Sequence, residues 1–277
     1  MPEIELSNCT DCMKCVNDCP VNAIDLTNER ILTKCIQCGH CVAICPESCF
    51  TPFHEEIIPL GDRVIKTEML ENHFAGLRSV RKFKKSKVSE TDLNRLISNM
   101  KNYSSASNTR LLEITVVQDA EKIRILNDMT MDTIIRALNL GVHPLLRPLT
   151  AIFRPGLDFR LLSKYRKSFI KQRSEGSQAV CHGAPLIMLF HGPKISESML
   201  DADANIWAAN TVSLAATMGI GSCYIGFIVK SMARNKKLKA VFGIPENHVV
   251  HSVLAMGYQA VKYVNSTGRK EPKVSVA

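Results

Sequence analysis

Eight cysteines near the start of the chain repeat one spacing twice. Each run reads C-x2-C-x2-C-x3-C-P, and the runs comprise Cys9, Cys12, Cys15 and Cys19 before Pro20, then Cys35, Cys38, Cys41 and Cys45 before Pro46. This spacing is typical of 4Fe–4S ligation, in which the fourth cysteine of each run binds the other cluster. It predicts two ligand sets, one of Cys9, Cys12, Cys15 and Cys45 and one of Cys35, Cys38, Cys41 and Cys19. Structural zinc and a disulfide framework are the alternatives, and the doubled, proline-closed spacing disfavours both.

The segments that must position these thiols form an internal duplication. At an offset of 26 residues three apolar pairs recur, Leu6 with Leu32, Val16 with Val42, and Ile24 with Phe50. We therefore expect two pseudo-symmetric halves. Each half should have a strand (around 4–6 and 31–33), a cluster loop, a short helix opened by the fourth cysteine, and a return strand. Cys49 aligns with Ala23, so it is predicted to pack rather than to bind a cluster.

Length and composition suit a small domain joined to a larger one. The chain has 277 residues, of which 45% are hydrophobic, so a sizeable core can be buried. The chain has eleven cysteines, and the iron–sulfur spacing of eight of them favours a reducing, cytoplasmic compartment over a secreted disulfide framework. The segment Met1–Leu6 has neither a basic nor an apolar region, so no secretion signal is expected.

Charge and hydropathy argue against nucleic-acid and membrane partners. The formal net charge is +9, but two clusters and a cofactor phosphate would bring it to about +3. No nucleic-acid-binding motif is visible. The stretch Ile206–Val229 has no charged residue and could span a bilayer by length. Its polar residues and the break at Gly219-Ile-Gly221 instead predict a buried helix followed by a tight loop, without a transmembrane segment.

Prolines at 52 and 59 and a glycine at 61 indicate a domain boundary, which gives a first domain at 1–55 and a second at 56–277. Apolar periodicity in the second domain predicts helices at 69–77, 90–100, 120–140, 200–218 and 231–242, and strands at 111–117, 185–190 and 249–256. Helices and strands do not alternate regularly, which favours an α+β sandwich over a doubly wound sheet.

Residues 141–176 form an insertion with a dense basic and aromatic run. Its cations include Arg154, Lys167 and Lys171, and Arg173 ends the run. A substrate-covering lid, a docking patch for an acidic partner, an interfacial amphipathic helix and a solvated surface insertion all remain open.

Few motifs in the second domain point to chemistry by themselves. No dinucleotide-binding glycine motif and no P-loop is present. The histidines have no partners at ligand spacing, so each is expected to be a surface or packing residue. Arg78-Ser79-Val80-Arg81 places two guanidiniums and a hydroxyl within four residues. Forked arginine donors suit the oxygens of a phosphate.

Residues 66–270 resemble the FMN-dependent nitroreductase family, and the first domain resembles two-cluster bacterial ferredoxins. The nitroreductase-like motifs occur in the family's order, and they are Leu77-Arg-Ser-Val-Arg-Lys-Phe83, Ser104-Ser-Ala-Ser-Asn108, Gly219-Ile-Gly-Ser-Cys-Tyr-Ile-Gly226, Gly243-Ile-Pro245 and Gly257-Tyr258. The fold class implied is α+β, with a small ferredoxin-like domain holding two 4Fe–4S clusters and a nitroreductase-like α+β sandwich.

The resemblance implies a set of FMN contacts. The phosphate would be held by Arg78, Ser79 and Arg81, with Arg269 or Lys270. Contacts from the partner subunit of a homodimer, formed through the flavin domain, would come from Ser104, Ser105 and Asn108. The isoalloxazine would be lined by Tyr224, Ile225 and Gly226. The chain departs from the family pattern at Leu77, which replaces an arginine, and at Arg110-Leu-Leu112, which replaces Q-P-W and leaves the substrate open.

The function implied is that of an iron–sulfur flavoprotein oxidoreductase. An external low-potential donor, a ferredoxin or similar carrier with NAD(P)H as an alternative, would supply electrons through the clusters to FMN. The small-molecule acceptor would be a nitroaromatic, a quinone or an activated alkene. The cofactor would carry the chemistry, so no catalytic acid–base pair is expected. The alternatives are a redox carrier or sensor acting through the basic insertion, and a specialised chemistry such as reductive dehalogenation.

Overall fold

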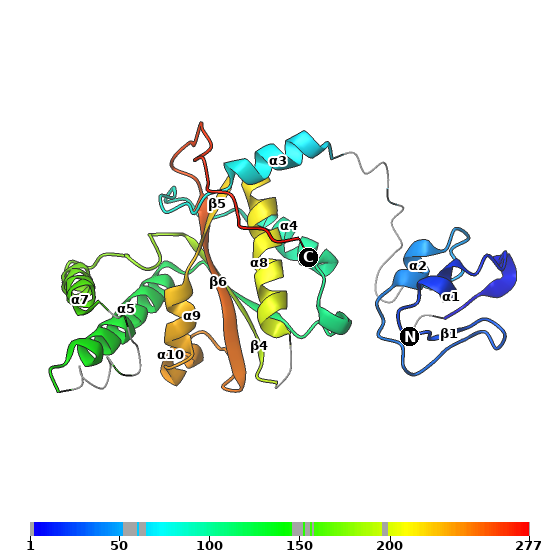
Figure 1. Ribbon diagram of the computed structural model, residues 1–277, viewed down its shortest axis with the longest axis horizontal. Coiled ribbons are helices and arrows are strands. Elements are labelled where there is room, and N and C mark those ends of the chain that lie inside the picture. Colours follow the sequence, from blue (N-terminus) through cyan, green and yellow to red (C-terminus); the bar gives the residue numbers. More distant parts are fainter. Residues whose placement is uncertain are drawn as a thin grey trace. The chain divides into compact units, whose positions relative to one another are not determined.

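The computed structural model describes residues 3–51, 60, 65–145, 152, 156, 158–195 and 199–276. The chain forms two compact units (Figure 1). The first comprises Met1–Lys66 with Ser105–Arg110, and the second comprises Thr67–Ser104 with Leu111–Ala277. The predicted boundary between residues 55 and 56 lies outside the described residues.

The first unit repeats one backbone conformation twice. Its elements are η1 (Leu6–Asn8), α1 (Lys14–Asp18), β1 (Ile24–Asp25), β2 (Arg30–Ile31) and α2 (His40–Ile44), with β1 antiparallel to β2. Three pairs of residues with positive φ recur at the 26-residue offset, namely Asp11 and Gln37, Met13 and Gly39, and Asn22 and Ser48. Left-handed conformations are uncommon outside glycine, so their repetition supports the predicted duplication at the level of the backbone.

Two local predictions for this unit are wrong. The short helix of each half lies before the fourth cysteine, because α1 ends at Asp18 and α2 ends at Ile44. Each of these helices starts directly after a left-handed residue, Met13 or Gly39, and so carries the third cysteine of its run. In addition, the strand predicted around 4–6 is reduced to an antiparallel bridge between Ile4 and Phe50, because Leu6 begins the 3₁₀ turn η1, in which the N–H of Cys9 donates to the Leu6 carbonyl.

The second unit is a four-stranded antiparallel sheet covered by helices on both faces. Its strands, in the order β3-β4-β6-β5, are β3 (Glu113–Val117), β4 (Leu186–Pro193), β6 (His248–Tyr258) and β5 (Ile220–Tyr224). The helices are α3 (Thr67–Gly76), α4 (Glu90–Asn99), α5 (Ala120–Val142), α7 (Phe159–Ser174), α8 (Leu200–Thr217), α9 (Gly226–Met232) and α10 (Lys236–Val241). A 3₁₀ turn of this unit is η2 (Met100–Asn102), whereas the turn η3 (Ala106–Asn108) lies in the segment that belongs to the first unit. The sheet and its helices form the predicted α+β sandwich.

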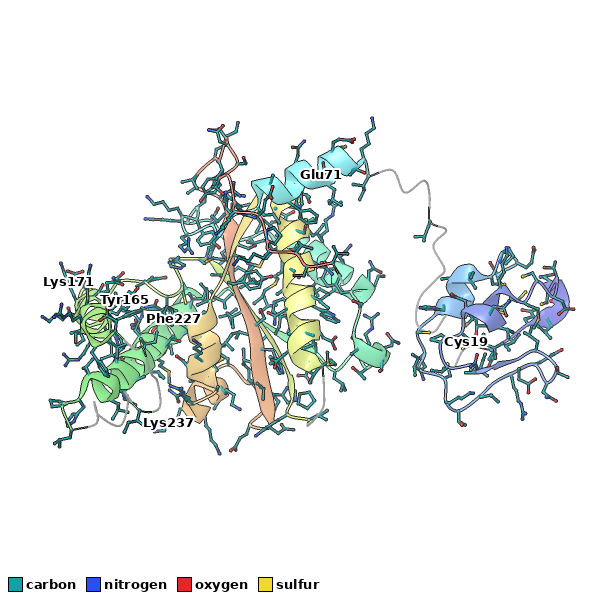
Figure 2. The ribbon with its side chains drawn as sticks, in the orientation of Figure 1. Cys19, Glu71, Tyr165, Lys171, Phe227 and Lys237 are labelled. Atoms are coloured by element: carbon teal, nitrogen blue, oxygen red, sulfur yellow. The ribbon has the colours of Figure 1, made fainter. Side chains whose placement is uncertain are left out.

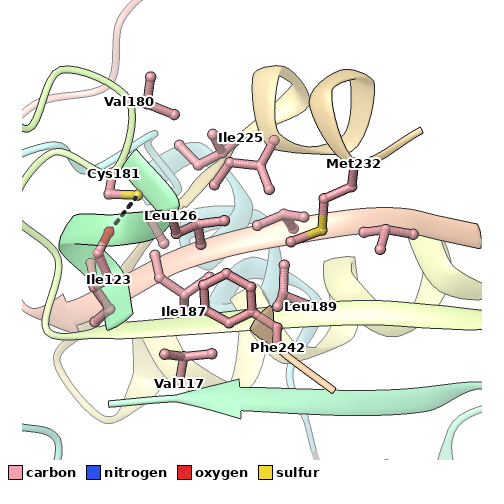
Figure 3. Packing of buried hydrophobic residues seen from close by; sticks show 14 of the residues in the cluster. Val117, Ile123, Leu126, Val180, Cys181, Ile187, Leu189, Ile225, Met232 and Phe242 are labelled. Carbon is pink, nitrogen blue, oxygen red and sulfur yellow. Dashed lines mark hydrogen bonds between the residues drawn. The ribbon is translucent and has the colours of Figure 1, made fainter. Parts of the chain in front are cut away.

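Alternation along β4 divides the core between the two faces of the sheet. Ile187 and Leu189 pack with side chains of α5, α9 and α10 (Figure 3). Met188 and Phe190 pack on the other face with α4 and α8. Every residue from Leu186 to Gly192 is buried, so β4 is the most enclosed strand of the sheet. Figure 1 shows α8 on one side of β6 and α9 with α10 on the other.

Side-chain caps mark where several helices begin, because the first N–H groups of a helix lack backbone acceptors. Ser89 Oγ accepts from the N–H of Asp92 at 3.1 Å, as the sequence predicted for α4. Asn235 Oδ1 accepts from the N–H of Leu238 at 3.1 Å and starts α10. That cap explains why the single helix predicted at 231–242 is in fact two helices, α9 and α10. The loop predicted at 219–226 is also wrong, since most of it is strand β5, paired with β6.

One buried amide joins α5 to the segment before β4. Asn127 is 1% exposed, and its Oδ1 accepts from the N–H groups of Val180 and Cys181 at 3.0 and 3.3 Å. Its Nδ2 donates to the Ser177 carbonyl at 3.1 Å. Nearby, the Cys181 thiol lies 4.0 Å from the Ile123 carbonyl (Figure 3). This segment is therefore held by side-chain hydrogen bonds where no regular secondary structure exists.

The described part of the basic insertion is mainly the helix α7. The Arg173 guanidinium bonds to Asp132 of α5 at 2.9 Å and lies 3.5 Å from Asp128. The ring of Phe169 meets that of Phe227 edge-on at 5.7 Å. Tyr165 and Lys171 are exposed on the same helix (Figure 2). Asp132 and Asp128 thus neutralise part of the basic charge of α7, and Phe169 packs part of the apolar face of this helix against Phe227 of α9. Among the described helices, none is long and apolar enough to cross a membrane.

Candidate functional site

The first unit gathers its thiols around two cavities. The first is lined by Cys9, Cys12, Cys15 and Cys45 together with Cys49, and the second by Cys19, Cys35, Cys38 and Cys41. Each cavity therefore takes three cysteines from one run and the fourth from the other run, which is the arrangement that the crossing rule predicts. All eleven cysteines are free thiols. The four cysteines of the repeated runs around each cavity fit a 4Fe–4S cluster, because such a cluster is held by four cysteines.

Burial, more than crowding, perturbs the ionisation of two of these thiols. The pKa of Cys41 is raised to about 11, mainly by burial and also by the nearby Cys35 and Cys38, against opposing backbone hydrogen bonds. Burial, followed by the charges of Cys45 and Cys12, raises the pKa of Cys15 in the other set. The Cys15 and Cys41 thiols therefore resist ionisation unless a cation joins them. Iron supplies that positive charge when a cluster binds.

Backbone N–H groups reach the sulfur atoms in both halves. The N–H of Ala23 donates to Cys19 Sγ at 3.2 Å, and the N–H of Cys49 donates to Cys45 Sγ at 3.3 Å. Hydrogen bonds to cluster sulfurs are one determinant of reduction potential. The Cys49 thiol is buried beside the first cavity, and burial is the main cause that raises its pKa to about 12. Its position matches that of Ala23, as the duplication predicts, and its role as a packing residue stays a prediction.

In the second unit, the arginine-containing motif lies along the edge strand β5. Ser79 forms a parallel bridge to Ser222, and the N–H of Val80 donates to the Ser222 carbonyl at 2.9 Å. Gly221 permits this approach, because a Cβ built there would lie 2.7 Å from the Val80 side chain. The motifs at 77–83 and 219–226, distant in sequence, therefore form one structural feature.

A cleft of about 420 Å³ opens beside this contact. Its wall includes Arg78, Gly219–Ser222 and the post-strand residues Lys262 and Tyr263. Clefts of roughly 300–1,000 Å³ are typical of cofactor and small-molecule sites. His73 of α3 also lines it, with its Nε2 2.8 Å from Ser213 Oγ. Lys262, Tyr263 and His73 are candidate contacts that no sequence motif marked.

Two predicted phosphate-binding arginines meet at one carbonyl. Arg78 Nη1 and Arg269 Nη2 donate to the Leu77 carbonyl at 2.6 and 2.7 Å. Arg78 also bonds to the carbonyls of Ala75 and Asn265. The structure thereby brings the start of the motif and the C-terminal segment together. Lys270 is exposed in that segment.

Arg81, the second arginine of the motif, has other neighbours than Arg78. Its guanidinium donates to the Ser79 carbonyl at 3.4 Å. Burial raises the pKa of Cys223, and the positive charge of Arg81 opposes that rise. Burial and then the Arg81 charge lower the pKa of His182. Arg81 therefore makes the surroundings of Ser79 electropositive, which favours an anionic ligand.

The predicted isoalloxazine contacts lie where β5 ends. Tyr224 is the last residue of β5 and is half-exposed, while Ile225 is buried. Gly226 begins α9. Burial raises the pKa of the Tyr224 phenol, which is consistent with an apolar surrounding.

The predicted contacts at 104–108 have other partners in this chain. The Ser104 carbonyl accepts from Trp207 Nε1 at 2.7 Å. Ser105 and Asn108 belong to the first unit, where Asn108 Nδ2 donates to the carbonyls of Ile36 and Gln37 at 3.2 and 2.8 Å. They do not line the cleft of the second unit. Their assignment as flavin contacts from a partner subunit stays a prediction.

The cleft fits a cofactor that carries a phosphate. Arg78 lines the cleft and offers forked donors, and the apolar wall includes Val80. The Ser79 and Ser222 backbones approach closely beside it because of Gly221. Among the described lining residues, Arg78 is the one that the sequence predicted as an FMN contact, and Arg269 is linked to it through the shared Leu77 carbonyl. An α+β sandwich with such a cleft, in one chain with a unit that has two cavities lined by the crossed sets of cysteines, defines a class of iron–sulfur oxidoreductase.

Comparison with known families identifies both parts. Residues 75–258 match the model of the nitroreductase family, and residues 1–46 match that of the 4Fe-4S dicluster domain. The chain therefore belongs to the nitroreductase family, a class of FMN-dependent oxidoreductases, and carries an N-terminal 4Fe–4S dicluster domain. This confirms the predicted fusion of the two domains.

Known proteins agree with this assignment. A protein of Archaeoglobus fulgidus, provisionally named an NADH dehydrogenase/NAD(P)H nitroreductase, is 32% identical over 98 residues, which cover 33% of this chain and 56% of that protein. The chain thus spans about half the length of this curated relative. A nitroreductase with bound FMN from Bacteroides fragilis has a TM-score of 0.57 at 20% identity, covering 76% of this chain and 100% of that one. A second, from Desulfitobacterium hafniense, has a TM-score of 0.56 at 16% identity, covering 77% and 100%. Both structures share the fold of the part of this chain that they cover.

Proposed function

We propose that this protein is a reductase that passes electrons through two 4Fe–4S clusters to FMN and then to a small acceptor. The acceptor class is a nitroaromatic, a quinone or an activated alkene, and the donor is a low-potential carrier such as a ferredoxin, with NAD(P)H as the alternative. The observation that supports this most directly is the presence, in one chain, of two cavities lined by the crossed sets of cysteines and a cleft lined by Arg78. Both solved neighbours named above are nitroreductases with bound FMN.

The cysteines would hold the clusters in the two crossed sets. Bound FMN supplies chemistry that links single electrons to a two-electron reduction, and the protein supplies position and electrostatics. Arg78, Ser79 and Arg81, with Arg269 or Lys270, would hold the phosphate. Tyr224, Ile225 and Gly226 would cover the ring system and exclude water from it.

A homodimer of the flavin domain is part of the proposal. Helix α3 exposes Met69 at 64% and Phe74 at 50% of their surfaces, together with Leu70. Adjacent exposed apolar side chains on one short helix favour burial against a partner. The resemblance to the family adds that FMN binds at the subunit interface, which would be the place for Ser104, Ser105 and Asn108. The thiol-rich first unit favours a reducing compartment such as the cytoplasm.

Cofactor content and FMN affinity test the assignment of residues. Purified without oxygen, the protein should contain about eight irons per chain, for two four-iron clusters, and one FMN. Hydrogen bonds to charged groups contribute about 1.5–3 kcal/mol, so Arg78→Gln or Arg269→Gln should weaken FMN binding by roughly 10- to 150-fold. Arg95→Gln, on the exposed face of α4, is the matched control. Equal FMN affinity in all four proteins would contradict the proposed phosphate site.

Electron entry needs a separate experiment. Reduced ferredoxin should bleach the flavin of the wild-type protein without NAD(P)H. In Cys15→Ser, which removes one proposed ligand, this reaction should slow strongly, while a small chemical reductant still bleaches the flavin. An unchanged rate with ferredoxin, or rapid bleaching by NADH alone, would make the clusters accessory to the reaction.

A redox sensor or carrier is the second candidate function. The exposed cations Lys164, Lys167 and Lys171 on α7 favour it, because they could meet an acidic partner. The pairing of Arg173 with Asp132 removes part of this charge from solvent. Steady-state turnover of a nitro or quinone substrate that is unaffected by Lys164→Gln and Lys167→Gln would leave the sensor without support.

A further inference from the structure

Three strands bring polar side chains together at one end of the second unit's sheet. Glu113 of β3 stands directly opposite His191 of β4. His191 in turn stands opposite Val250 of β6, and His248 lies two residues earlier on that strand. Directly opposed residues and those at j±2 share a face of a sheet. The two histidines and the carboxylate therefore project from one face, although 57 residues separate His191 from His248 in sequence.

The three side chains present ligand atoms to one another. His191 Nδ1 lies 3.0 Å from His248 Nδ1, and His248 Nδ1 lies 4.0 Å from a Glu113 carboxylate oxygen. All three candidate ligand atoms lie within 4.8 Å of each other. His191 is 2% exposed and His248 is 8% exposed, whereas the Glu113 side chain is 62% exposed. The group is thus enclosed on the histidine side and open to solvent on the carboxylate side.

We propose that Glu113, His191 and His248 bind a divalent transition metal of the zinc type, with a fourth position open to water. Zinc binds nitrogen at about 2.0–2.1 Å in tetrahedral geometry, which places two ligand atoms about 3.3 Å apart. The observed separations of 3.0 and 4.0 Å lie on either side of that value. A small side-chain rotation is enough to reach it. Two imidazoles and one carboxylate are a ligand set that zinc uses, and imidazole disfavours magnesium and calcium.

A second hydrogen bond sets the orientation of one ring. Thr115 Oγ1 lies 2.9 Å from His191 Nε2. When Nε2 carries the proton and donates to this hydroxyl, Nδ1 keeps its lone pair and faces His248. Metal-binding histidines usually have such a partner on the nitrogen that does not bind the metal, and losing it costs roughly 10- to 100-fold in metal affinity. The Thr115 hydroxyl therefore supports the site in addition to the three ligands.

The surrounding charges are compatible with a cation. Lys239 of α10 donates to the carbonyls of Glu246 and His248 at 2.7 and 2.9 Å, so its ammonium is engaged by backbone oxygens. His251 pairs with Asp201 through its Nδ1. Glu113 is thus the carboxylate that faces both rings. A direct hydrogen bond between neutral His191 and His248 is the competing arrangement, and it needs neither Glu113 nor a metal.

Zinc binding by the full-length holoprotein tests the proposal. The protein, with its iron content measured so that the cluster thiols are known to be filled, is dialysed without oxygen against buffered Zn²⁺, and bound zinc is counted by mass spectrometry. The wild type should bind one zinc per chain more than His248→Gln. Glu113→Gln should bind at least tenfold more weakly, and Thr115→Val roughly 10- to 100-fold more weakly. Glu90→Gln, an exposed glutamate on α4, should match the wild type.

Folding and non-specific binding are controlled in the same samples. Glu113 is largely exposed, so Glu113→Gln remains informative if His248→Gln does not fold. Zn²⁺ should raise the unfolding temperature of the wild type and leave that of Glu113→Gln unchanged, since a ligand stabilises only the state that it binds. Equal zinc binding by the wild type and Glu113→Gln, or equal thermal shifts, would overturn the proposal and leave a simple histidine–histidine hydrogen bond.

Discussion

Replacing Gly221 by alanine is expected to separate the arginine motif from strand β5. The added Cβ would lie 2.7 Å from three carbon atoms of Val80, whereas carbon atoms pack best at about 3.5–4.0 Å. The backbones must therefore move apart by about 1 Å. A movement of that size stretches the 2.9 Å hydrogen bond between Val80 N and Ser222 O beyond the roughly 3.2 Å limit of such bonds.

The cost combines two effects. Overpacking of this kind costs about 1–3 kcal/mol, and a lost backbone hydrogen bond costs about 0.5–1.5 kcal/mol. We therefore expect Gly221→Ala to lower the free energy of unfolding of the second unit by about 2–4 kcal/mol. Because Arg78 and Ser79 lie in the displaced segment, FMN should also bind at least tenfold more weakly, which corresponds to about 1.4 kcal/mol.

The single tryptophan makes this measurement selective. Trp207 is the only tryptophan of the chain, and it is buried on α8 with its ring edge-on to Tyr103 at 6.0 Å. Urea unfolding followed by its fluorescence, in the FMN-free protein, reports on the second unit alone. Gly76→Ala, where a Cβ has no neighbour within 4 Å, is the control for stability and should be neutral or up to about 1 kcal/mol more stable.

A double variant tests the cause. Val80→Gly removes all three atoms that the new Cβ would meet, so Gly221→Ala should cost at least about 1 kcal/mol less in that background than in the wild type. The reasoning is refuted if Gly221→Ala changes the unfolding free energy by less than about 0.5 kcal/mol and leaves FMN affinity unchanged. It is also refuted if the two substitutions are simply additive.

Three further outcomes are expected. Cys49→Ala should retain the wild-type iron content, because Cys49 is predicted to pack rather than to bind a cluster, whereas Cys45→Ala should lose half of the iron or more. Asn127→Leu should lower the free energy of unfolding reported by tryptophan fluorescence by about 2–4 kcal/mol, because two buried N–H groups lose their acceptor. The pKa of His182 is lowered from its ordinary 6.5, so the unfolded chain takes up the proton first. Its contribution to stability is full above about pH 6.5 and is lost as the pH falls. His182→Gln should therefore lessen the decline in stability of the FMN-free protein between pH 7.5 and 5.5.

Much of the first unit was predictable from the sequence, because cluster ligands follow a fixed spacing along the chain. The cysteine spacing and the 26-residue offset led to two crossed ligand sets, and the two cavities are lined by these sets, with Cys49 in addition at the first. The helix position was wrong, because spacing alone does not reveal the left-handed residues Met13 and Gly39 that start each helix. The start of α7 was also missed. Asp158 caps this helix by accepting from two N–H groups, but the prediction for this segment rested on its basic and aromatic residues.

Sequence spacing could not reveal contacts that depend on strand register. The histidines were expected to lack partners, yet His191 and His248 meet because β4 pairs with β6 in one particular register with an irregularity after Phe190. The segment after Met218 was expected to be a loop, since its glycines suggested a turn. Gly221 is instead needed for the close approach of Val80 within a strand. In both cases the deciding partner lies far away in the chain.

The crossed lining of the two thiol cavities has a consequence for how the first unit matures. Cys45 of the second run lies with the first three cysteines, and Cys19 of the first run lies with the later ones. Neither copy of the duplicated segment contains a complete set of four on its own. If each set holds one cluster, as proposed, each cluster would tie the two copies together, and filling one site would help to arrange the other. Assembly should approach an all-or-none process, in which partly filled chains are rare.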